Sequence, residues 1–512
     1  MLFNSVVFIF AFLPVAWAGY FLLGWMEARR AGGRGAGARA GLWAKAWLVG
    51  ASLFFYGYWD PSFLPLILFS VGFNYLLGRR LRRNTERVGE RHGMLTFGVV
   101  VNLGLLGGFK YTAFFAETAN FVFEAGLNVP SLVLPLAISF FTFQQIAYLV
   151  DSARGRVAAD TSAPGSGVLD DFVSYALFVT FFPQLIAGPI VHHARVIPQF
   201  RNGAARHPLA NNIALGLIVF GFGLFKKVVV ADSFAPLVDA GFAGAQGLGF
   251  WEAWTAALGY SVQLYYDFSG YSDMAVGLAL LFNIRLPFNF DSPYKARSIR
   301  EFWRRWHITL SEFLRDYLYI PLGGNRVAEW RVNANLLLTF LLGGLWHGAG
   351  WTFVVWGGLH GAALVAHRAW VRLGGRMPAM AGWALTLLFV VFTWVFFRAN
   401  TLQDALAMSR AMVDLSPDNL ALPWGTLDAL GHWTDRPLHA TWAWRDGMAA
   451  ASPMALPLVL AALAFAATAP NTNRFRDGVA SRGWLLVAGV LFGVAVAALF
   501  ASSSSVFLYF DF

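Results

Sequence analysis

The residue best suited to catalytic chemistry is His347, in the stretch LLTFLLGGLWHGAGWTFVVWGGLHG at residues 337–361. The stretch is apolar enough for a membrane helix, and glycines interrupt it. Ionisable residues at that depth are rare and usually functional, although a histidine can also simply form a hydrogen bond across a helix bundle. A neutral imidazole can remove a proton from a hydroxyl at neutral pH. Gly344 and Gly348 form a GxxxG pattern, which also predicts close helix packing.

The segment before this histidine, SPYKARSIREFWRRWHITLSEFLRDYLYIPLGGNR at residues 292–326, is too charged to span a membrane. Ser298 and Glu301 match an S-x-x-E capping box, so we expect one helix from there to about Tyr319. One face repeats polar residues at steps of three and four, namely Arg297, Arg300, Arg304, His307 and Ser311. The adjacent face is apolar and aromatic. This pattern predicts an amphipathic helix at the cytoplasmic membrane interface.

Two interpretations of the basic face stay open. Arginine and tryptophan could simply anchor the helix to lipid. Alternatively, Arg300, Arg304 and Arg305 could bind an anionic cytoplasmic substrate, because a planar guanidinium donates paired hydrogen bonds to phosphate. His307 is in line with these arginines and could point at the same ligand, although a lone histidine is more often structural.

Other polar residues occur within apolar runs. In FVTFFPQLIAGPIVHHARVIPQF, residues 178–200, prolines and a glycine predict broken helix, and His192 and His193 are expected at the surface in a loop. In the run at 260–290, Asp267 and Asp273 are costly at membrane depth unless they are paired or hydrated. Gln263 and Tyr266 from this run, with Asn335, could line a polar tunnel, or they could form interhelical hydrogen bonds.

Composition defines the class of protein. Of 512 residues, 57% are hydrophobic and only 13% are charged, which indicates a polytopic, all-α membrane protein. The chain has no cysteine, which excludes disulfides, thiolate nucleophiles and cysteine-ligated metal centres. No HExxH or other metal-ligand spacing and no GxSxG elbow occurs, so we expect no metal. The net charge of +10 suits anionic lipid and does not by itself imply nucleic acid.

Span-length apolar runs predict about ten to twelve membrane helices with re-entrant pieces, in one domain covering residues 1–512. Basic loops follow the first and third runs, which puts both loops in the cytoplasm and the N-terminus outside. Residues 414–453 are expected to form an extramembrane loop on the periplasmic side. The candidate runs are 3–24, 42–59, 62–78, 94–113, 131–150, 172–191, 211–231, 252–283, 335–346 joined to 350–370, 382–398, 455–470 and 484–505.

Taken together, these blocks resemble the membrane-bound O-acyltransferase (MBOAT) family, in its bacterial alginate O-acetyltransferase (AlgI-like) branch. The specific part is FNFDSPYKARSIREFWRRWHITLSEFLRDYLYIPLGGNR followed by NLLLTFLLGGLWHGAGWTFVVWGGLHG. The opening MLFNSVVFIFAFLPVAWAGYFLLG, the stretch FFPQLIAGPIVHHARVIPQF and the terminal FLYFDF also fit, so the resemblance runs over nearly the whole chain.

The resemblance implies a ring of membrane helices around a central tunnel, with a funnel from the cytoplasm. It implies that His347, in W-H-G, is the catalytic histidine and that His307, in F-W-R-R-W-H, is the second family histidine. It further implies acetyl-CoA as the donor substrate, no tightly bound cofactor, periplasmic acetyltransferase partners, an exopolysaccharide as final acceptor and a place in the bacterial inner membrane. Trp346 is expected beside the substrate.

Three alternatives remain at this point. A related enzyme could transfer D-alanyl or another acyl group to a cell-envelope hydroxyl. A polysaccharide transporter would explain the spans and the polar centre, but not the W-H-G block together with the basic helix. A scaffold for periplasmic partners should tolerate the loss of His347. Acetyl-CoA consumption separates the enzyme from the other two classes.

Overall fold

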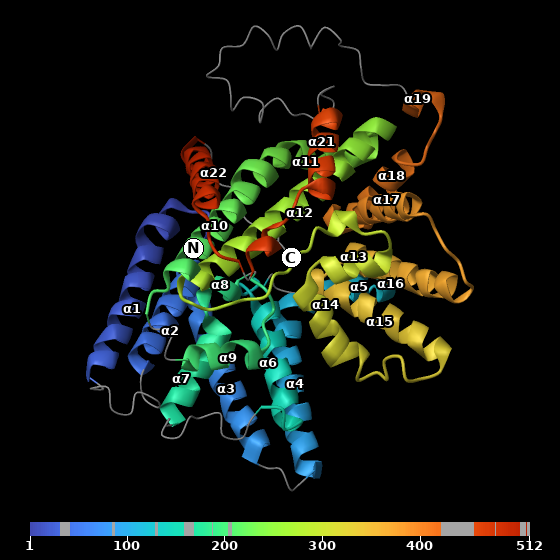
Figure 1. The fold of residues 1–512 in the computed structure, drawn as a ribbon. Coiled ribbons are helices and arrows are strands. Elements are labelled where there is room, and N and C mark those ends of the chain that lie inside the picture. Colours follow the sequence, from blue (N-terminus) through green and yellow to red (C-terminus); the bar gives the residue numbers. More distant parts are fainter. Residues whose placement is uncertain are drawn as a thin grey trace. The chain divides into compact units, whose positions relative to one another are not determined.

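We describe a computed structural model of the chain (Figure 1). It describes residues 1–30, 41–83, 88–128, 132–157, 168–186, 188–202, 207–420, 455–476, 478–501 and 508. Every regular element within these ranges is a helix, which confirms the all-α prediction. Most of the predicted extramembrane loop at 414–453 lies outside the described residues.

Seven helical segments in the described part of the chain are long and apolar enough to cross a membrane. The chain is therefore a multi-pass membrane protein, as the composition indicated, while the larger number of ten to twelve spans stays a prediction. The seven segments are Phe8–Arg30, Pro61–Arg83, Val88–Lys110, Ala210–Ala243, Ala379–Arg398, Ala455–Phe475 and Arg482–Ala501.

The helices divide into two compact units. The first contains Met1–Leu224, Tyr271–Phe288 and Phe475–Ser502, and the second contains Phe225–Gly270, Asn289–Arg474 and Ser503–Phe512. The long helix α12 (Phe250–Leu281) contributes to both units. His307 and His347 both lie in the second unit.

The first unit is a helical bundle in which buried polar side chains find partners across helices. Asn74 and Asn102, for example, exchange reciprocal amide hydrogen bonds of 3.1 and 2.7 Å between α3 and α4. Its helices are η1 (Phe8–Phe12), α1 (Leu13–Arg30), α2 (Leu42–Gly57), η2 (Pro61–Phe63), α3 (Leu64–Arg83), α4 (Val88–Lys110), α5 (Thr112–Phe123), α6 (Ile138–Ala153), α7 (Val168–Thr180), α8 (Phe182–Leu185), α9 (His193–Arg201), α10 (Ala210–Phe225, of which the last residue begins the second unit) and α22 (Arg482–Ala501).

The proline-rich stretch in this unit is broken, as the sequence predicted. Helix α7 ends at Thr180, and α8 begins with Pro183 in its first turn. The side chain of Gln184 donates to the Phe178 carbonyl, so a backbone group near the break is satisfied inside the protein, as an apolar environment requires.

The prediction that both adjacent histidines lie at the surface is wrong for His193, which is buried with 4% of its surface exposed. His192 precedes α9 in extended conformation as its N-cap, so the two rings do not diverge as they would on a helix. Their centroids lie 4.3 Å apart.

The second unit contains a buried cluster of charged side chains, together with both short and long helices. Asp267 on α12 is ion-paired with Lys227, which also contacts Asp232 at 2.9 Å, so the predicted need for a partner at this depth is met. Its helices are η4 (Lys226–Ala231), α11 (Asp232–Ala243), η5 (Ala245–Gly247), η6 (Pro293–Lys295), α13 (Ile299–Arg305), α14 (Ile308–Leu314), η7 (Arg315–Tyr319), α15 (Glu329–His347), α16 (Trp351–Arg372), α17 (Ala379–Arg398), α18 (Leu402–Ala411), α19 (Pro417–Leu420), α21 (Ala455–Thr468) and η9 (Thr472–Phe475).

The amphipathic segment begins as predicted and then departs from the prediction. The Ser298 hydroxyl accepts from the Glu301 N–H at 3.2 Å, which confirms the N-terminal cap. The expected single helix to Tyr319 is wrong, because α13 ends at Arg305 and α14 starts only at Ile308. His307 occupies the bend with a φ of 42°, a left-handed conformation that a helix cannot contain.

Candidate active site

Helices α15 and α16 form a hairpin that places His347 at its turn, as the last residue of α15. Glycines make the close approach possible: a Cβ on Gly344 would collide with the Phe353 carbonyl, and one on Gly357 would collide with the Phe340 carbonyl. Arg372 is ion-paired with Glu329 at the far ends of the two helices. The GxxxG interpretation is thus confirmed for Gly344, and the packing it permits also fixes the position of the histidine.

Aromatic rings surround the His347 imidazole, which is 97% buried. Ring centroids lie 4.9 Å away for Trp346, 5.1 Å for Trp356 and 5.2 Å for Phe397, all edge-on. Such packing restricts the rotation of the imidazole and excludes water from most of its surface.

His307 owes its position to a segment outside its own helix. The Asn289 carbonyl accepts from the Ile308 N–H at 2.9 Å, and the Asp291 N–H donates to the Arg305 carbonyl at 2.9 Å. The Asn289 side-chain oxygen accepts from both the N–H and the hydroxyl of Thr309, at 3.2 and 2.7 Å. Asn289 thus caps α14 in place of its N-cap residue, which leaves the His307 side chain free of that role.

The two imidazoles lie near each other, with ring centroids 6.4 Å apart. His307 packs edge-on against Phe268 at 4.8 Å and against Trp346 at 6.1 Å. It is fully buried, and neither ring nitrogen has a hydrogen-bond partner among the residues that the structure describes. Burial lowers the pKa of His307, so its imidazole is neutral at pH 7 and offers one donor and one acceptor.

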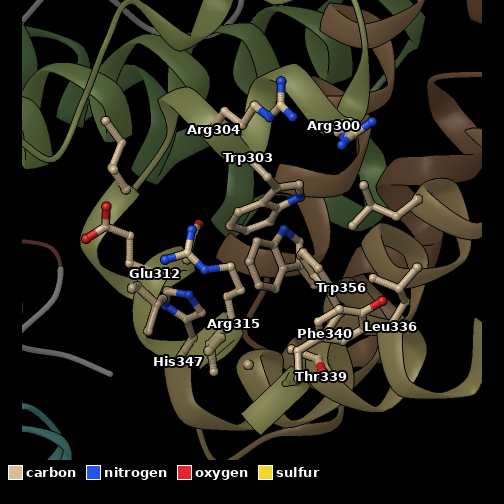
Figure 2. A pocket seen from close by; sticks show the side chains of 17 residues that line it. Arg300, Trp303, Arg304, Glu312, Arg315, Leu336, Thr339, Phe340, His347 and Trp356 are labelled. Carbon is tan, nitrogen blue, oxygen red and sulfur yellow. The ribbon is translucent and has the colours of Figure 1, made fainter. Parts of the chain in front are cut away.

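A pocket of about 500 Å³ opens onto His347. Figure 2 shows Arg300 and Arg304 at one end, Trp303 and Trp356 in the middle, and His347 with Arg315 at the other end. The pocket therefore joins cationic side chains to the buried imidazole through an aromatic passage. Its other lining residues are Ile308, Leu310, Ser311, Glu312, Leu314, Tyr319, Leu336, Thr339, Phe340, Gly343 and Leu364.

The sequence-predicted site residues separate into two groups. His347, Arg300 and Arg304 line the pocket. The remaining candidates are not among the described residues that line it: His307, Arg305, Trp346, Asn335, Gln263 and Tyr266.

Contacts explain the place of several residues in the second group. Arg305 is paired with Glu301 at 2.9 Å and donates to the Asp291 carbonyl at 3.0 Å, so it fixes the bend. Asn335 donates to the Leu322 carbonyl at 3.0 Å and so holds the loop before α15. Gln263 and Tyr266 are buried on α12.

Sequence reasoning missed Arg315 and the two tryptophans of the passage as pocket residues. Arg315 follows Ser311 by one more step of four in the predicted polar series, so the spacing contained the signal. Trp303 belongs to the apolar, aromatic face of the predicted amphipathic helix, and Trp356 lies in the candidate membrane run 350–370. Only the bend at His307 and the α15–α16 hairpin bring these rings together.

His360, the second histidine of the hairpin, has a different environment. Its Nδ1 accepts from the Trp303 indole N–H at 3.2 Å, and its Nε2 lies 3.0 Å from the Thr393 hydroxyl oxygen. That hydroxyl donates to the Val390 carbonyl at 2.9 Å, so Nε2–H is the donor toward Thr393. Trp356 contacts both His360 and His347, with centroids at 4.8 and 5.1 Å.

Comparison with known proteins identifies the family. Residues 157–408 match the family model of the membrane-bound O-acyltransferases. The chain is 45% identical to a peptidoglycan O-acetyltransferase of Helicobacter pylori, over 100% of this chain and 98% of that one. This chain belongs to the MBOAT family. It is therefore an acyltransferase, and the predicted resemblance is confirmed.

Two further relatives of this MBOAT protein differ in the transfer that their names describe. A probable alginate O-acetylase of Pseudomonas aeruginosa is 42% identical over 80% of this chain and 75% of its own length. A teichoic acid D-alanyltransferase of Streptococcus thermophilus is 29% identical over 47% of this chain and 59% of its own. The names of these three relatives specify acyl transfer involving peptidoglycan, alginate and teichoic acid.

Proposed function

We propose that this MBOAT enzyme transfers an acetyl group from cytoplasmic acetyl-CoA toward a hydroxyl of a bacterial polysaccharide, with periplasmic acetyltransferase partners completing the transfer. One observation carries the proposal: a single pocket joins Arg300 and Arg304 to the buried His347. The relatives support acetyl as the transferred group, since the two that this chain covers over most of their length are an O-acetyltransferase and a probable O-acetylase.

The arginine end suits the charged part of the donor. Guanidinium groups bind phosphate through paired, charge-assisted hydrogen bonds, and Arg300 and Arg304 come from one turn of α13. The pocket volume of about 500 Å³ is that of a site for a drug-sized molecule, which fits an extended thioester arm better than an entire coenzyme. The phosphates then stay at the mouth, while the acetyl thioester reaches His347 past Trp303 and Trp356.

The His347 end suits the transfer step. A ring nitrogen of His347 accepts the proton of the attacking hydroxyl as its oxygen bonds to the acetyl carbonyl carbon. The carbon–sulfur bond breaks, and the thiolate takes the proton from the imidazolium to leave as CoA thiol. His307, neutral and 6.4 Å from His347 between ring centroids, orients the hydroxyl or polarises the carbonyl. The reaction needs no metal and no tightly bound cofactor.

The final acceptor has two candidates. An alginate-like exopolysaccharide is supported by the 42% identity to a probable alginate O-acetylase. Peptidoglycan is supported by the 45% identity that extends over the whole of this chain. D-alanyl transfer has weaker support, because the match to a teichoic acid D-alanyltransferase covers only 47% of this chain.

The proposal puts the protein in the inner membrane, with the arginine end of the pocket open to the cytoplasm, where acetyl-CoA is made. The charge of the first two basic loops supports this orientation, with the N-terminus in the periplasm.

The test uses purified full-length protein in detergent. We expect it to release CoA thiol from acetyl-CoA when a hydroxyl acceptor is present, and we expect the His347→Ala variant to lose this activity while it elutes as the same folded species. A folded His347→Ala protein with normal turnover would overturn the assignment. Comparison of ester-linked acetate on exopolysaccharide and on peptidoglycan, in cells with and without the gene, then identifies the acceptor.

A further inference from the structure

A second basic pocket lies wholly within the first unit and takes no part in the proposed chemistry. It has a volume of about 200 Å³ and combines side chains from α3, α7 and α9 with the end of α6. Of the described residues that line it, three are arginines, Arg82, Arg156 and Arg201, and one is a carboxylate, Asp171. The other lining residues are Tyr148, Val157, Tyr175, His193, Ala194, Ile197 and Pro198.

The charges of this pocket do not balance. Asp171 is shared by two of the arginines, at 3.3 Å from Arg82 and 2.8 Å from Arg201, and it also accepts from the Tyr75 hydroxyl at 3.1 Å. The third arginine, Arg156, has 65% of its side chain exposed and lies 3.8 Å from Asp151. Among the residues that the structure describes here, three guanidinium groups thus face two carboxylates, an excess of one positive charge at a half-buried site.

A buried imidazole provides an independent sign of a ligand. His193 lines the pocket and is 96% buried, yet neither of its ring nitrogens forms a hydrogen bond within the described part of the chain, where its Nδ1 lies 4.0 Å from a carboxylate oxygen of Asp151. The Nε atom of Arg201 is likewise buried without a described partner. Burial lowers the pKa of His193 to about 4, so it is a neutral imidazole with one N–H to donate. Unused buried donors are costly unless something accepts from them.

Asp151, His192 and His193 bring three possible metal-ligand atoms within 4.8 Å of one another, but the hydrogen bonds of His192 disfavour a metal. The Nδ1 of His192 accepts from the Ala194 N–H at 3.2 Å. The proton of the neutral ring is therefore on Nε2, which donates to Asp151 at 2.6 Å. A metal would require the lone pair at that same nitrogen.

We propose that this pocket binds a phosphate group, held by Arg82, Arg156, Arg201 and the N–H of His193. The excess of one positive charge matches a phosphodiester monoanion. The volume of about 200 Å³ is below that of pockets for drug-sized ligands, so it holds a headgroup rather than a whole nucleotide. Arg82 lies in the last turn of α3, beside a basic loop that the charge distribution puts at the cytoplasmic membrane surface. The phosphate of an anionic phospholipid and a soluble phosphate share this chemistry.

A matched pair of variants tests the proposal. Arg156 and Arg154 lie on the same loop and are both exposed, but only Arg156 lines the pocket. Full-length Arg156→Gln and Arg154→Gln proteins in nanodiscs are compared for retention of phosphatidylglycerol by native mass spectrometry. In phosphatidylcholine nanodiscs they are titrated with inorganic phosphate. Because both changes remove the same charge at nearly the same place, a general electrostatic effect would be equal in the two variants.

We expect Arg156→Gln to weaken binding of phosphatidylglycerol or of inorganic phosphate about tenfold, as the loss of one charge-assisted hydrogen bond implies. Arg154→Gln should leave it unchanged, and His193→Phe should repeat the loss without any change of charge. An effect on phosphatidylglycerol alone identifies a lipid headgroup, and an effect on inorganic phosphate identifies a soluble ligand. Equal binding by the Arg156→Gln and Arg154→Gln proteins for both probes, whether at or below the wild-type level, would overturn the proposal.

Discussion

His307 and His360 are both fully buried histidines of the second unit, and their surroundings could hardly differ more. His360 stands in an uninterrupted chain of hydrogen bonds from Trp303 to Thr393 and on to the Val390 carbonyl. His307 has no described partner for either ring nitrogen, and its backbone is in a left-handed conformation. Burial alone therefore does not mark a reactive histidine. A buried imidazole whose donor and acceptor positions both lack a described partner is the better candidate for a reactive role.

The largest effect on turnover is expected for His347→Ala. Removal of a general base typically lowers the rate by about 10² to 10⁴-fold, while the hairpin glycines that hold the backbone are untouched. Release of CoA thiol by purified protein measures the change, and the melting temperature controls for folding. If activity persisted, the catalytic role would have to pass to another residue of the same pocket.

A smaller loss is expected for His307→Asn. Asparagine adopts left-handed backbone readily, so the bend is preserved while the ring is removed. If the imidazole donates to the developing oxyanion, kcat should fall by about 100-fold with little change in the KM for acetyl-CoA. An increase in KM at constant kcat would contradict this role and would indicate ground-state binding instead.

A third prediction uses neighbouring arginines of α13. Arg304→Gln should raise the KM for acetyl-CoA about tenfold, because it removes a charge-assisted contact to phosphate at the pocket mouth. Arg305→Gln should leave the KM unchanged, since Arg305 is already paired with Glu301 and Asp291. Steady-state kinetics of the two variants measure the difference. Equal effects on KM would mean that net charge, rather than position in the pocket, attracts the donor.

The smallest effect on turnover is expected for His360→Phe. The ring shape is kept, but the buried Trp303 N–H loses its acceptor and Thr393 loses its donor, which should lower the free energy of unfolding by about 1–3 kcal/mol for each group left unsatisfied. Thermal melting in detergent should show the destabilisation, and activity per folded molecule should be retained. A loss of kcat without a loss of stability would remove the distinction between the two buried histidines.

The sequence predicted the parts of this protein that depend on local pattern. Membrane helices follow from long apolar runs, the Ser298 cap from its spacing to Glu301, and the candidate base from a lone histidine in a glycine-interrupted helix. It failed where distant residues decide the outcome. The bend at His307 depends on Asn289, and the pairing of Arg305 depends partly on Asp291, so helical periodicity alone extended one helix through both.

The cap that Asn289 places on α14 also limits how the candidate reaction centre can be transferred to another protein. Residues 292–361 contain both histidines. The hydrogen bonds that set the angle of His307, however, come from Asn289 and Asp291, which precede this range. Residues 292–361 grafted alone into another protein would keep the His347 hairpin and lose the orientation of the His307 imidazole. During biosynthesis, likewise, the hydrogen bonds that form the bend at His307 use only chain that has already been made, whereas the position of His347 depends on the later closing of the α15–α16 hairpin.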